Sequence, residues 1–381
     1  MRLTETLLQV QLCTMHSQQP RVTNVLIAGG GSGGHVAPAI ASAESLSAKG
    51  VHVLLAHSNR KIDFDMMEDS PFDSVVLAAA PLSMKPLGLI RFCIGFLRAT
   101  HQVKRIIKEN KIDCVLATGG FVSAPALHAG RKVGCKTVLL NLDDPPGKAN
   151  KLAVRWADTV LTTVICALND AVKIAPPLRQ SVIASKNAGE SKKIFGLNPN
   201  RMMLLVTGAS QGASTINQLL PALAKMQPTF FQGWEILHIA GNDHADSVKQ
   251  AWQDAGVSCR VVGFIQNMGD AWGAADLAIT RGGANTIAEI SINRVPSIVL
   301  PYPYHQDDHQ RTNAEPLEEL GGVYIANDHK QLELNLKDAG VLILELLKQH
   351  QTRFTMRQAM VESPSSNGAD AIASACLSKP D

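Results

Sequence analysis

Residues 22–38 read VTNVLIAGGGSGGHVAP. The run from Val22 to Ala28 is mostly apolar and rich in β-branched side chains, which predicts a buried strand. Glycine-rich residues 29–34 follow, and the apolar periodicity from His35 to Ala48 predicts a helix. Glycines let a backbone approach a ligand closely, and a helix start offers unpaired N–H groups and a positive dipole end. The stretch therefore predicts the opening of an α/β domain whose first turn suits an anion.

The same order of strand, small-residue turn and helix returns in the second half of the chain. Met202 to Thr207 is a predicted strand, and Gly208 to Ala213 is the turn that follows it. Further apolar runs predict strands at 51–56, 74–79, 112–117 and 137–140, and at 235–240, 275–280 and 297–300. Short apolar runs between helical patterns are typical of parallel sheets covered on both faces. We predict two Rossmann-like, doubly wound parallel-sheet domains.

The length of 381 residues also favours two domains. We expect an N-terminal extension over 1–21, a first domain over 22–175 and a linker over 176–200, which contains three prolines. The second domain is expected over 201–352. The helical tail over 353–381 is expected to pack back on the first domain.

Composition excludes several classes of protein. Hydrophobic residues make up 45% and charged residues 18%, a globular balance, and a net charge of +3 gives no reason to expect nucleic-acid binding. Seven widely spaced cysteines without a CxxC pair argue against a disulfide framework and a zinc site, and they fit a reducing cytosol. No apolar run reaches the roughly 18 residues of a membrane span. We expect no metal and no cofactor, and we interpret Asp63-Phe64-Asp65 as a surface loop.

The first glycine-rich turn has more than one interpretation. Gly29, Gly31 and Gly34 satisfy the G-x-G-x-x-G pattern of a dinucleotide site. That site also needs an acidic residue after the second strand, where residues 56–60 have no carboxylate. A tight turn without a ligand is a further alternative. His35 begins the helix beside the turn, and it is a candidate catalytic residue.

The second half holds two more candidate sites. Ser210 in the small-residue turn can offer its hydroxyl to a phosphate, although a capped helix explains the turn as well. Residues 280–289 place glycines between a strand and a helix, with Arg281 available for charge compensation. Glu289 in that helix either binds ligand hydroxyls or is solvated. Residues 302–313 follow the next strand, at the sheet edge where α/β proteins bind ligands, and their amide and His side chains suit sugar hydroxyls.

Five segments in this order resemble the MurG family of glycosyltransferases. They are GGGSGGHVAP at 29–38, TGGFVSAP at 118–125, GASQGASTIN at 208–217, RGGANTIAE at 281–289 and DHQRTNAEPL at 308–317. The resemblance covers both halves of the chain and implies the GT-B fold, in which two Rossmann-like domains face a cleft. It implies an inverting hexosyltransferase that moves N-acetylglucosamine from UDP-N-acetylglucosamine to a lipid-linked muramoyl-pentapeptide, in peptidoglycan precursor synthesis.

The resemblance also implies roles for individual residues. The donor would be held by Ser32, Gly33, Gly34, Arg179, Ser210, Ile265, Arg281, Ala284, Asn285, Thr286, Glu289, His309 and Gln310. Within this set, Ser210 would contact the diphosphate, the backbone of Ile265 the uracil, and Glu289 the ribose. His309 and Gln310 would contact the hydroxyls of the N-acetylglucosamine.

The acceptor would be held by Gly31, Phe121, Asn141 and Asn150. This half departs from the family, because Phe121 replaces its Tyr. In place of the family's His-Glu-Gln-Asn run, the spacing puts Asn141 at its Glu and Asp143 at its Asn, or one position away. His35 is the first candidate for the base that deprotonates the acceptor hydroxyl, and Asp143 is the second. A transferase for another lipid or glycan acceptor, an epimerase-like GT-B protein and an NAD(P)-dependent oxidoreductase remain alternatives.

The segment from Leu82 to Lys111 is unusually basic. Its net charge is +6, while that of the whole chain is +3. Its apolar residues are too interrupted to span a bilayer but suit a helix that lies on one. An ordinary amphipathic helix packed on the sheet is the alternative. We predict peripheral binding to an anionic membrane surface, at the cytoplasmic face of the cell membrane.

Overall fold

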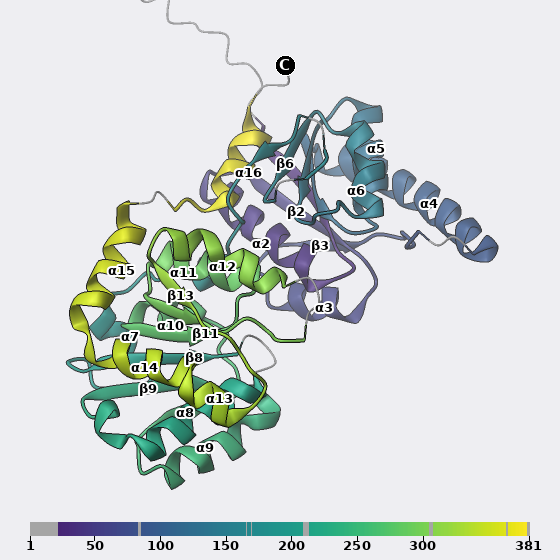
Figure 1. The fold of residues 1–381 in the computed structure, drawn as a ribbon. Helices are drawn as coiled ribbons and strands as arrows, with labels where there is room; N and C mark the ends of the chain where they lie inside the picture. The colour runs from purple at the N-terminus through teal and green to yellow at the C-terminus, as the bar shows by residue number, and fades with distance from the viewer. Residues whose placement is uncertain are drawn as a thin grey trace, which may run out of the picture. The chain divides into compact units, whose positions relative to one another are not determined.

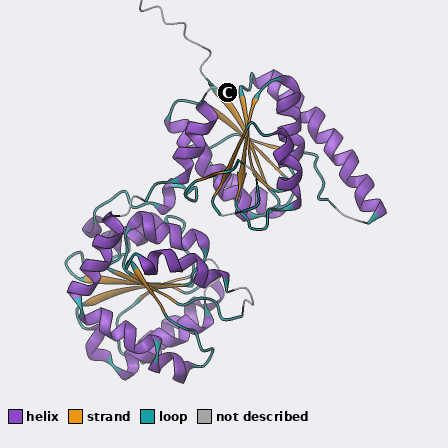
Figure 2. Cartoon of the chain, turned by 45° about the horizontal axis from the view of Figure 1, so that its top comes forward, coloured by secondary structure: helices purple, strands orange, loops and turns teal. Residues whose placement is uncertain are grey.

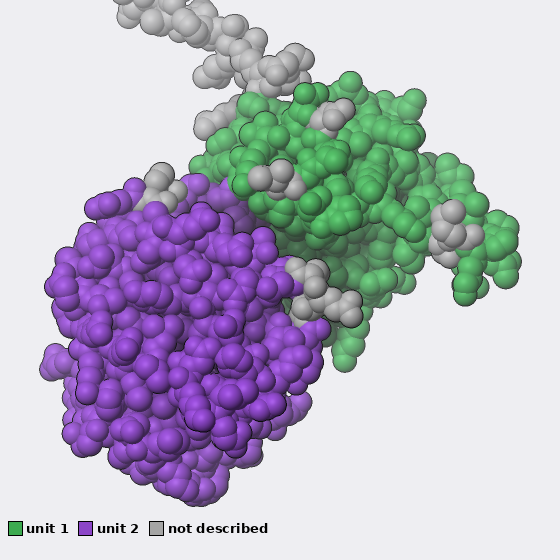
Figure 3. All heavy atoms as spheres, viewed as in Figure 1, with its two compact units in different colours: residues 1–174, 369–381 green, residues 175–368 purple. Residues whose placement is uncertain are grey.

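The computed structural model describes residues 22–82, 85–164, 166–168, 170–208, 213–304, 308–362 and 365–378. The chain forms two compact units, one of residues 1–174 with 369–381 and one of residues 175–368 (Figure 3). Each unit has a parallel sheet with helices on both of its faces (Figures 1 and 2). The predicted pair of parallel-sheet α/β domains is confirmed.

The described residues of unit 1 form a seven-stranded sheet in the order β3-β2-β1-β4-β5-β6-β7. The strands are β1 (Asn24–Gly29), β2 (His52–His57), β3 (Ser74–Val76), β4 (Cys114–Gly119), β5 (Lys136–Asn141), β6 (Thr159–Thr162) and β7 (Val172–Lys173). Residues 25–29 of β1 are all buried, which is why this strand is a continuous apolar run. The strand order reverses between β1 and β4, and a doubly wound sheet binds ligands at such a point.

The helices of unit 1 cover both faces of this sheet. They are α2 (Gly33–Ala48), α3 (Lys61–Glu68), α4 (Pro86–Asn110), α5 (Ser123–Val133), α6 (Lys148–Ala153) and α16 (Gly368–Leu377). Ile372, Ala373 and Cys376 of α16 are buried among residues of β1 and α2, and Ser45 donates a 2.6 Å hydrogen bond to Asp370. Helix α16 is therefore part of the core of unit 1.

The described residues of unit 2 form a six-stranded sheet in the order β10-β9-β8-β11-β12-β13. The strands are β8 (Met202–Thr207), β9 (Trp234–Ile239), β10 (Arg260–Val262), β11 (Leu277–Thr280), β12 (Ser297–Val299) and β13 (Val323–Ile325). The helices are α7 (Ala188–Ile194), α8 (Ser214–Met226), α9 (Ala245–Asp254), α10 (Met268–Ala274), α11 (Ala284–Asn293), α12 (His309–Glu319), α13 (Leu332–Lys337), α14 (Ala339–Lys348) and α15 (His350–Glu362). The strand order reverses between β8 and β11, the same switch as in unit 1.

Two segments differ from the sequence-based expectation. Residues 176–200, expected as a linker, contain the short helix η2 (Gln180–Val182) and α7, and both belong to unit 2. The tail, expected as one helix, is divided into α15 in unit 2 and α16. A Cβ on Gly368 would lie 1.7 Å from the carbonyl oxygen of Ala175, so only glycine fits where the chain leaves unit 2.

Candidate functional site

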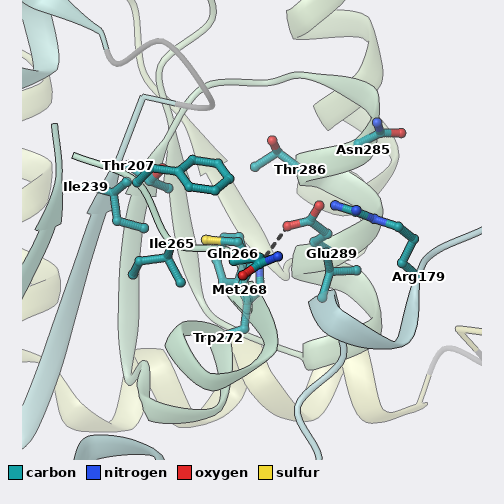
Figure 4. Close-up of a pocket in the computed structure, with 12 residues that line it drawn as sticks. Arg179, Thr207, Ile239, Ile265, Gln266, Met268, Trp272, Asn285, Thr286 and Glu289 are labelled. Carbon is teal, nitrogen blue, oxygen red and sulfur yellow. Dashed lines mark hydrogen bonds between the residues drawn. The ribbon is translucent and has the colours of Figure 1, made fainter. Parts of the chain in front are cut away.

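A cavity of about 240 Å³ opens in unit 2 beside the switch between β8 and β11 (Figure 4). Its lining comes from the ends of β8 and β9, from the loop before α10, from α10 and α11, and from residues 179–184 around η2, here called the η2 segment. The residues are Arg179, Val182, Thr207, Ile239, Phe264, Ile265, Gln266, Met268, Trp272, Asn285, Thr286 and Glu289. Arg179, Ile265, Asn285, Thr286 and Glu289 were singled out from the sequence, and the fold brings these five together.

The start of α11 forms one wall of this cavity. A Cβ on Gly282 would lie 2.2 Å from the carbonyl oxygen of Gln310, so the turn before α11 requires glycine there. Thr286 and Glu289 are three residues apart and share the face of α11 that lines the cavity. Ala284, the first residue of α11, is exposed at the N-terminus of the helix.

Glu289 is the acidic residue of the cavity lining. Its Oε2 accepts a 2.8 Å hydrogen bond from Nε1 of Trp272, drawn as a dashed line in Figure 4. Burial raises the pKa of Glu289 to about 7, and the Trp272 hydrogen bond and the Arg179 charge act in the opposite direction. The carboxylate is therefore poised to titrate near neutral pH.

Arg179 is held opposite Glu289 by contacts of the η2 segment. Nδ2 of Asn293 donates to the carbonyls of Val182 and Glu289 at 2.9 and 2.8 Å, while its Oδ1 accepts from the N–H of Ala184 at 2.7 Å. One amide thus ties this segment to α11. On the other side, a Cβ on Gly269 of α10 would lie 2.4 Å from the carbonyl oxygen of Ile183.

Arg281 does not line the cavity, although the sequence suggested that its charge would compensate a ligand. Its guanidinium is buried and forms a 2.8 Å ion pair with Asp328, whose side chain is fully buried. It also donates to Oγ1 of Thr215 at 2.6 Å and to the carbonyl of Leu300 at 2.9 Å. The charge of Arg281 is therefore used to join α8, β12 and the loop of Asp328 to the end of β11.

His309 and Gln310 begin α12. Oε1 of Gln310 accepts from the N–H groups of Gly282 and Tyr302 at 3.2 and 2.9 Å, so this amide ties the two turns that follow β11 and β12. Ser210, expected at the diphosphate, lies outside the described residues.

The first glycine-rich turn, in unit 1, is held by a carboxylate that the sequence did not identify. The N–H of Gly31, where φ is +95°, donates to Oδ2 of Asp63 at 2.7 Å, and Oγ of Ser58 donates to the same oxygen at 2.6 Å. The interpretation of residues 63–65 as a surface loop was wrong, because Asp63 lies in α3 and is fully buried. The N–H of Gly31 is therefore already hydrogen-bonded to Asp63 and does not point to a ligand.

Phe121 and Arg60 pack against the same turn. A Cβ on Gly31 would lie 2.9 Å from the Phe121 ring, so the ring rests on this glycine. The guanidinium of Arg60 lies 5.4 Å from the centroid of that ring and donates to the carbonyl of Gly31 at 2.6 Å. These contacts fix the backbone of the turn.

Ser32, Gly33 and Gly34 follow at the start of α2, where helix N–H groups are directed out of the turn. His35 lies in the first turn of α2, and its ring packs against Gly119, on which a Cβ would lie 2.2 Å from Nδ1. That Nδ1 is buried and has no hydrogen-bond partner among the described residues.

Asn141, at the end of β5, is fully buried and hydrogen-bonds within the fold. Its Oδ1 accepts from Nδ2 of Asn150 at 3.0 Å, and its Nδ2 donates to the backbone carbonyl of Asp143 at 2.8 Å. Asn150 is also buried, whereas Asp143 is exposed. Of these three, Asp143 has the side chain that solvent and ligands reach.

Sequence reasoning missed seven residues of the cavity lining: Val182, Thr207, Ile239, Phe264, Gln266, Met268 and Trp272. Five of them are apolar or aromatic, a type that also fills every core, so no local pattern distinguishes them. Thr207 offered a signal, since it ends a strand directly before a small-residue turn.

Two doubly wound units, with a pocket at the switch point of the second, fit the class of GT-B glycosyltransferases. Family models agree: the glycosyltransferase family 28 N-terminal domain matches residues 25–162, and the family 28 C-terminal domain matches residues 203–372. The chain therefore belongs to glycosyltransferase family 28 and, within it, to the MurG family.

Individual relatives agree with this assignment. A protein of Ectopseudomonas mendocina is 33% identical over 80% of this chain and 85% of its own length, and one of Pseudomonas fluorescens is 30% identical over 93% and 98%. Both are named UDP-N-acetylglucosamine–N-acetylmuramyl-(pentapeptide) pyrophosphoryl-undecaprenol N-acetylglucosamine transferase. The crystal structure of Acinetobacter baumannii MurG has the same fold, with a TM-score of 0.68 and 23% identity over 93% of this chain and 99% of that one.

Proposed function

We propose that this protein transfers N-acetylglucosamine from UDP-N-acetylglucosamine to a lipid-linked muramoyl-pentapeptide. The observation that carries the proposal is the cavity of unit 2, where a carboxylate from α11 faces an arginine beside a helix N-terminus. A carboxylate accepts hydrogen bonds from the two hydroxyls of a ribose, and a helix start with an arginine suits a diphosphate. The names of the relatives supply the sugar and the acceptor.

In this proposal the donor lies along α11. Glu289 binds the ribose, the backbone of Ile265 binds the uracil, and Arg179 neutralises the diphosphate. Ala284, Asn285 and Thr286 present the N-terminus of α11 to the phosphates, and the role proposed for Ser210 is a contact with the diphosphate. His309 and Gln310 at the start of α12 face the hydroxyls of the N-acetylglucosamine. Arg281 contributes by fixing the turn before α11.

The acceptor binds at the loops that follow β1, β4 and β5 of unit 1. Gly31, Phe121, Asn141 and Asn150 shape this site, and Ser32, Gly33 and Gly34 direct N–H groups of α2 toward the reacting groups. The acceptor hydroxyl attacks the anomeric carbon, UDP leaves, and the configuration inverts. His35 takes the hydroxyl proton, with Asp143 as the second candidate for the base.

The experiment is a transfer assay with radiolabelled UDP-N-acetylglucosamine and a short-chain lipid-linked muramoyl-pentapeptide. We expect a labelled lipid product and equal release of UDP, both abolished in His35→Ala if His35 is the base. UDP release without any acceptor would instead indicate an epimerase-like reaction. Donor binding without transfer to this acceptor would show that the muramoyl-pentapeptide is not the acceptor. The differences from the family at Phe121 and Asn141 would then be the place to look for the cause.

We also propose that α4 attaches the protein to the cytoplasmic face of the membrane, where a lipid-linked acceptor must be met. Among the described residues, no helix is long and apolar enough to cross a bilayer. The first half of α4 extends away from the sheet (Figures 1 and 2) and exposes Leu87, Ile90, Ile94 and Leu97, at 75%, 56%, 45% and 68%.

Basic side chains accompany these apolar ones. Two hollows of about 570 Å³ each lie beside α4; one includes Lys85, Leu87 and Arg91, and the other Leu97, Arg98 and Arg105. Apolar groups that enter the headgroup region, with cations around them, are the features of an interfacial helix. Each Lys or Arg near an anionic surface adds about 1 kcal/mol.

A further inference from the structure

We propose that Trp272 is a positioning residue of the donor site, whose indole N–H favours the ionised form of the Glu289 carboxylate and holds it in one orientation toward the ribose. The inference rests on the proposed function, in which Glu289 binds the ribose hydroxyls. Trp272 itself acts through Glu289.

The hydrogen bond joins two helices that pack beside the cavity. Trp272 comes from α10 and is 1% exposed, and its Nε1 lies 2.8 Å from Oε2 of Glu289 on α11. The other oxygen, Oε1, has no hydrogen-bond partner among the described residues. An indole N–H has a single direction, so it holds one carboxylate oxygen and leaves the second to a ligand.

The indole is held in place, because Trp272 is 1% exposed within a cluster of buried apolar residues and one face of α10 packs closely against residues 183–191. A Cβ on Gly269 would lie 2.4 Å from the carbonyl oxygen of Ile183, and a Cβ on Gly273 would lie 2.8 Å from Oγ of Ser191. Both glycines bring one face of α10 against residues 183–191, which follow η2 along the chain. The fold therefore fixes the position of the Trp272 indole N–H before any ligand binds.

Few charged groups face Glu289, so the hydrogen bond from the Trp272 indole has a large effect on whether the Glu289 carboxyl is ionised. Arg179, from the η2 segment, is the other ionisable residue of the cavity lining. On α10, Asp270 forms a 2.8 Å ion pair with Lys186. From α12, Gln310 and Asn313 hydrogen-bond to Gly282. Burial raises the pKa of Glu289 to about 7, and the Trp272 hydrogen bond is the larger of the two influences that lower it.

The consequence is a donor affinity that depends on pH. An ionised carboxylate accepts hydrogen bonds at both oxygens, whereas a protonated one has lost acceptor capacity. Removing the indole N–H takes away an influence that favours the ionised form, so the pKa of Glu289 rises further. Donor binding should then need a higher pH.

The test measures the affinity for UDP-N-acetylglucosamine against pH, from 5.5 to 8.5, in the wild type, Trp272→Phe and Trp252→Phe. The diphosphate of this ligand is esterified at both ends, so its charge stays constant over that range. Trp252 is the matched control: it is also 1% exposed in unit 2, and its Nε1 donates to Nδ1 of His238 at 3.0 Å, away from the cavity lining.

We expect Trp272→Phe to weaken binding about ten- to hundredfold at pH 7, the loss typical of a hydrogen bond to a charged group. Its affinity should partly recover at pH 8.5, because the pH midpoint moves upward. Trp252→Phe should keep the wild-type midpoint whatever its stability. Equal midpoints in all three proteins would overturn the role of Trp272, while no binding by the wild type at any pH would reject the proposed donor site instead.

A second measurement covers the case in which Trp272→Phe fails to fold. The indole N–H resonance of Trp272 in the wild type should shift with pH around neutrality, as its acceptor titrates. The shift should vanish in Glu289→Gln. A resonance that is insensitive to pH in the wild type would overturn the proposal without any Trp272 variant.

Discussion

The ionised Glu289 carboxylate lowers the stability of the folded protein, although the proposed function uses it to bind the donor. Its carboxyl has a pKa of about 7 in the folded chain, above the value near 4.5 that it has when exposed. The folded state therefore holds the proton more tightly than the unfolded state. The contribution of this group to stability is fully present below pH 4.5 and is lost as the pH rises through 7. A ligand that donates hydrogen bonds to the ionised carboxylate offsets this loss of folding stability.

We predict opposite effects of Glu289→Gln on stability and on binding. The neutral amide keeps an oxygen for Trp272 and removes the buried charge, so at pH 8 the free variant should be more stable than the wild type by about 3 kcal/mol. The gain should shrink as the pH falls toward 4.5. Urea unfolding at several pH values measures it, and UDP-N-acetylglucosamine affinity should fall in the same variant.

Glu315 on α12 is exposed and provides the control. Glu315→Gln should change neither the pH dependence of stability nor the affinity. If Glu289→Gln behaved like this control, Glu289 would not be a buried charge at all.

The sequence could identify Glu289 but not the residues that support it. Glu289 stands in a short motif beside the glycines of its own turn, where the spacing left a ligand contact and a solvated side chain open and the family resemblance implied the ribose contact. Trp272 lies 17 residues away and Asp63 lies 32 residues from Gly31, and only folding brings each pair together. A charged residue such as Asp63 is usually exposed, and nothing local indicated that three hydrogen bonds would hold it in the interior.

The strands also differed in how well the sequence predicted them. The central strands, such as β1 and β8, are buried on both faces and read as unbroken apolar runs. The strands β6, β7, β10 and β13 were not predicted. They have two to four residues each and lie at or next to the edges of their sheets, so they carry little periodicity.

Several elements of unit 2 meet at the buried ion pair of Arg281 and Asp328, and we predict that breaking it is costly. Arg281→Met leaves the Asp328 carboxylate buried without its cation, which should lower the unfolding free energy by about 3–5 kcal/mol. The donor affinity should fall too, because Arg281 aligns the turn before α11. The double variant Arg281→Met, Asp328→Leu should regain most of the stability.

The exposed pair of Arg105 and Glu109 on α4, at 3.4 Å, is the comparison. Arg105→Met should cost less than about 1 kcal/mol, as surface pairs do. Similar losses in Arg281→Met and Arg105→Met, measured by urea unfolding, would contradict the structural role of Arg281.

The two halves of α4 have different surroundings, and this leads to a prediction about the membrane. The second half buries Ala99, Val103, Ile106 and Ile107 against unit 1, while the first half exposes five aliphatic side chains: Leu87, Leu89, Ile90, Ile94 and Leu97. We predict that Arg91→Glu, Arg98→Glu binds anionic vesicles at least about thirtyfold more weakly than the wild type at low salt, from about 1 kcal/mol for each lost cation.

The control reverses two exposed charges of unit 2, Lys225→Glu and Lys249→Glu, with the same change in net charge. Co-sedimentation should show wild-type binding for this variant. Equal loss in both double variants would mean that overall charge, rather than α4, attracts the vesicles.

At the scale of the whole molecule, each unit has its own hydrophobic core. The clusters of buried apolar residues around β1 and β4 lie entirely in unit 1, and those around β8 and β11 lie entirely in unit 2. The donor cavity is lined by residues of unit 2 alone. Donor binding should therefore stabilise unit 2 most directly.

We predict that UDP-N-acetylglucosamine raises the Tm of the protein while NAD and NADP do not. At a concentration of 100 times its Kd, a ligand that binds only the folded state adds about 2.7 kcal/mol. For a cooperative unit the size of residues 175–368, each kcal/mol corresponds to about 2–4 °C, so the transition of unit 2 should move by about 5–10 °C. Hydrogen exchange should slow chiefly around β8, the loop before α10, and α11. Protection concentrated at the glycine-rich turn of unit 1, or a Tm raised by NAD, would instead support the dinucleotide interpretation of Gly29, Gly31 and Gly34.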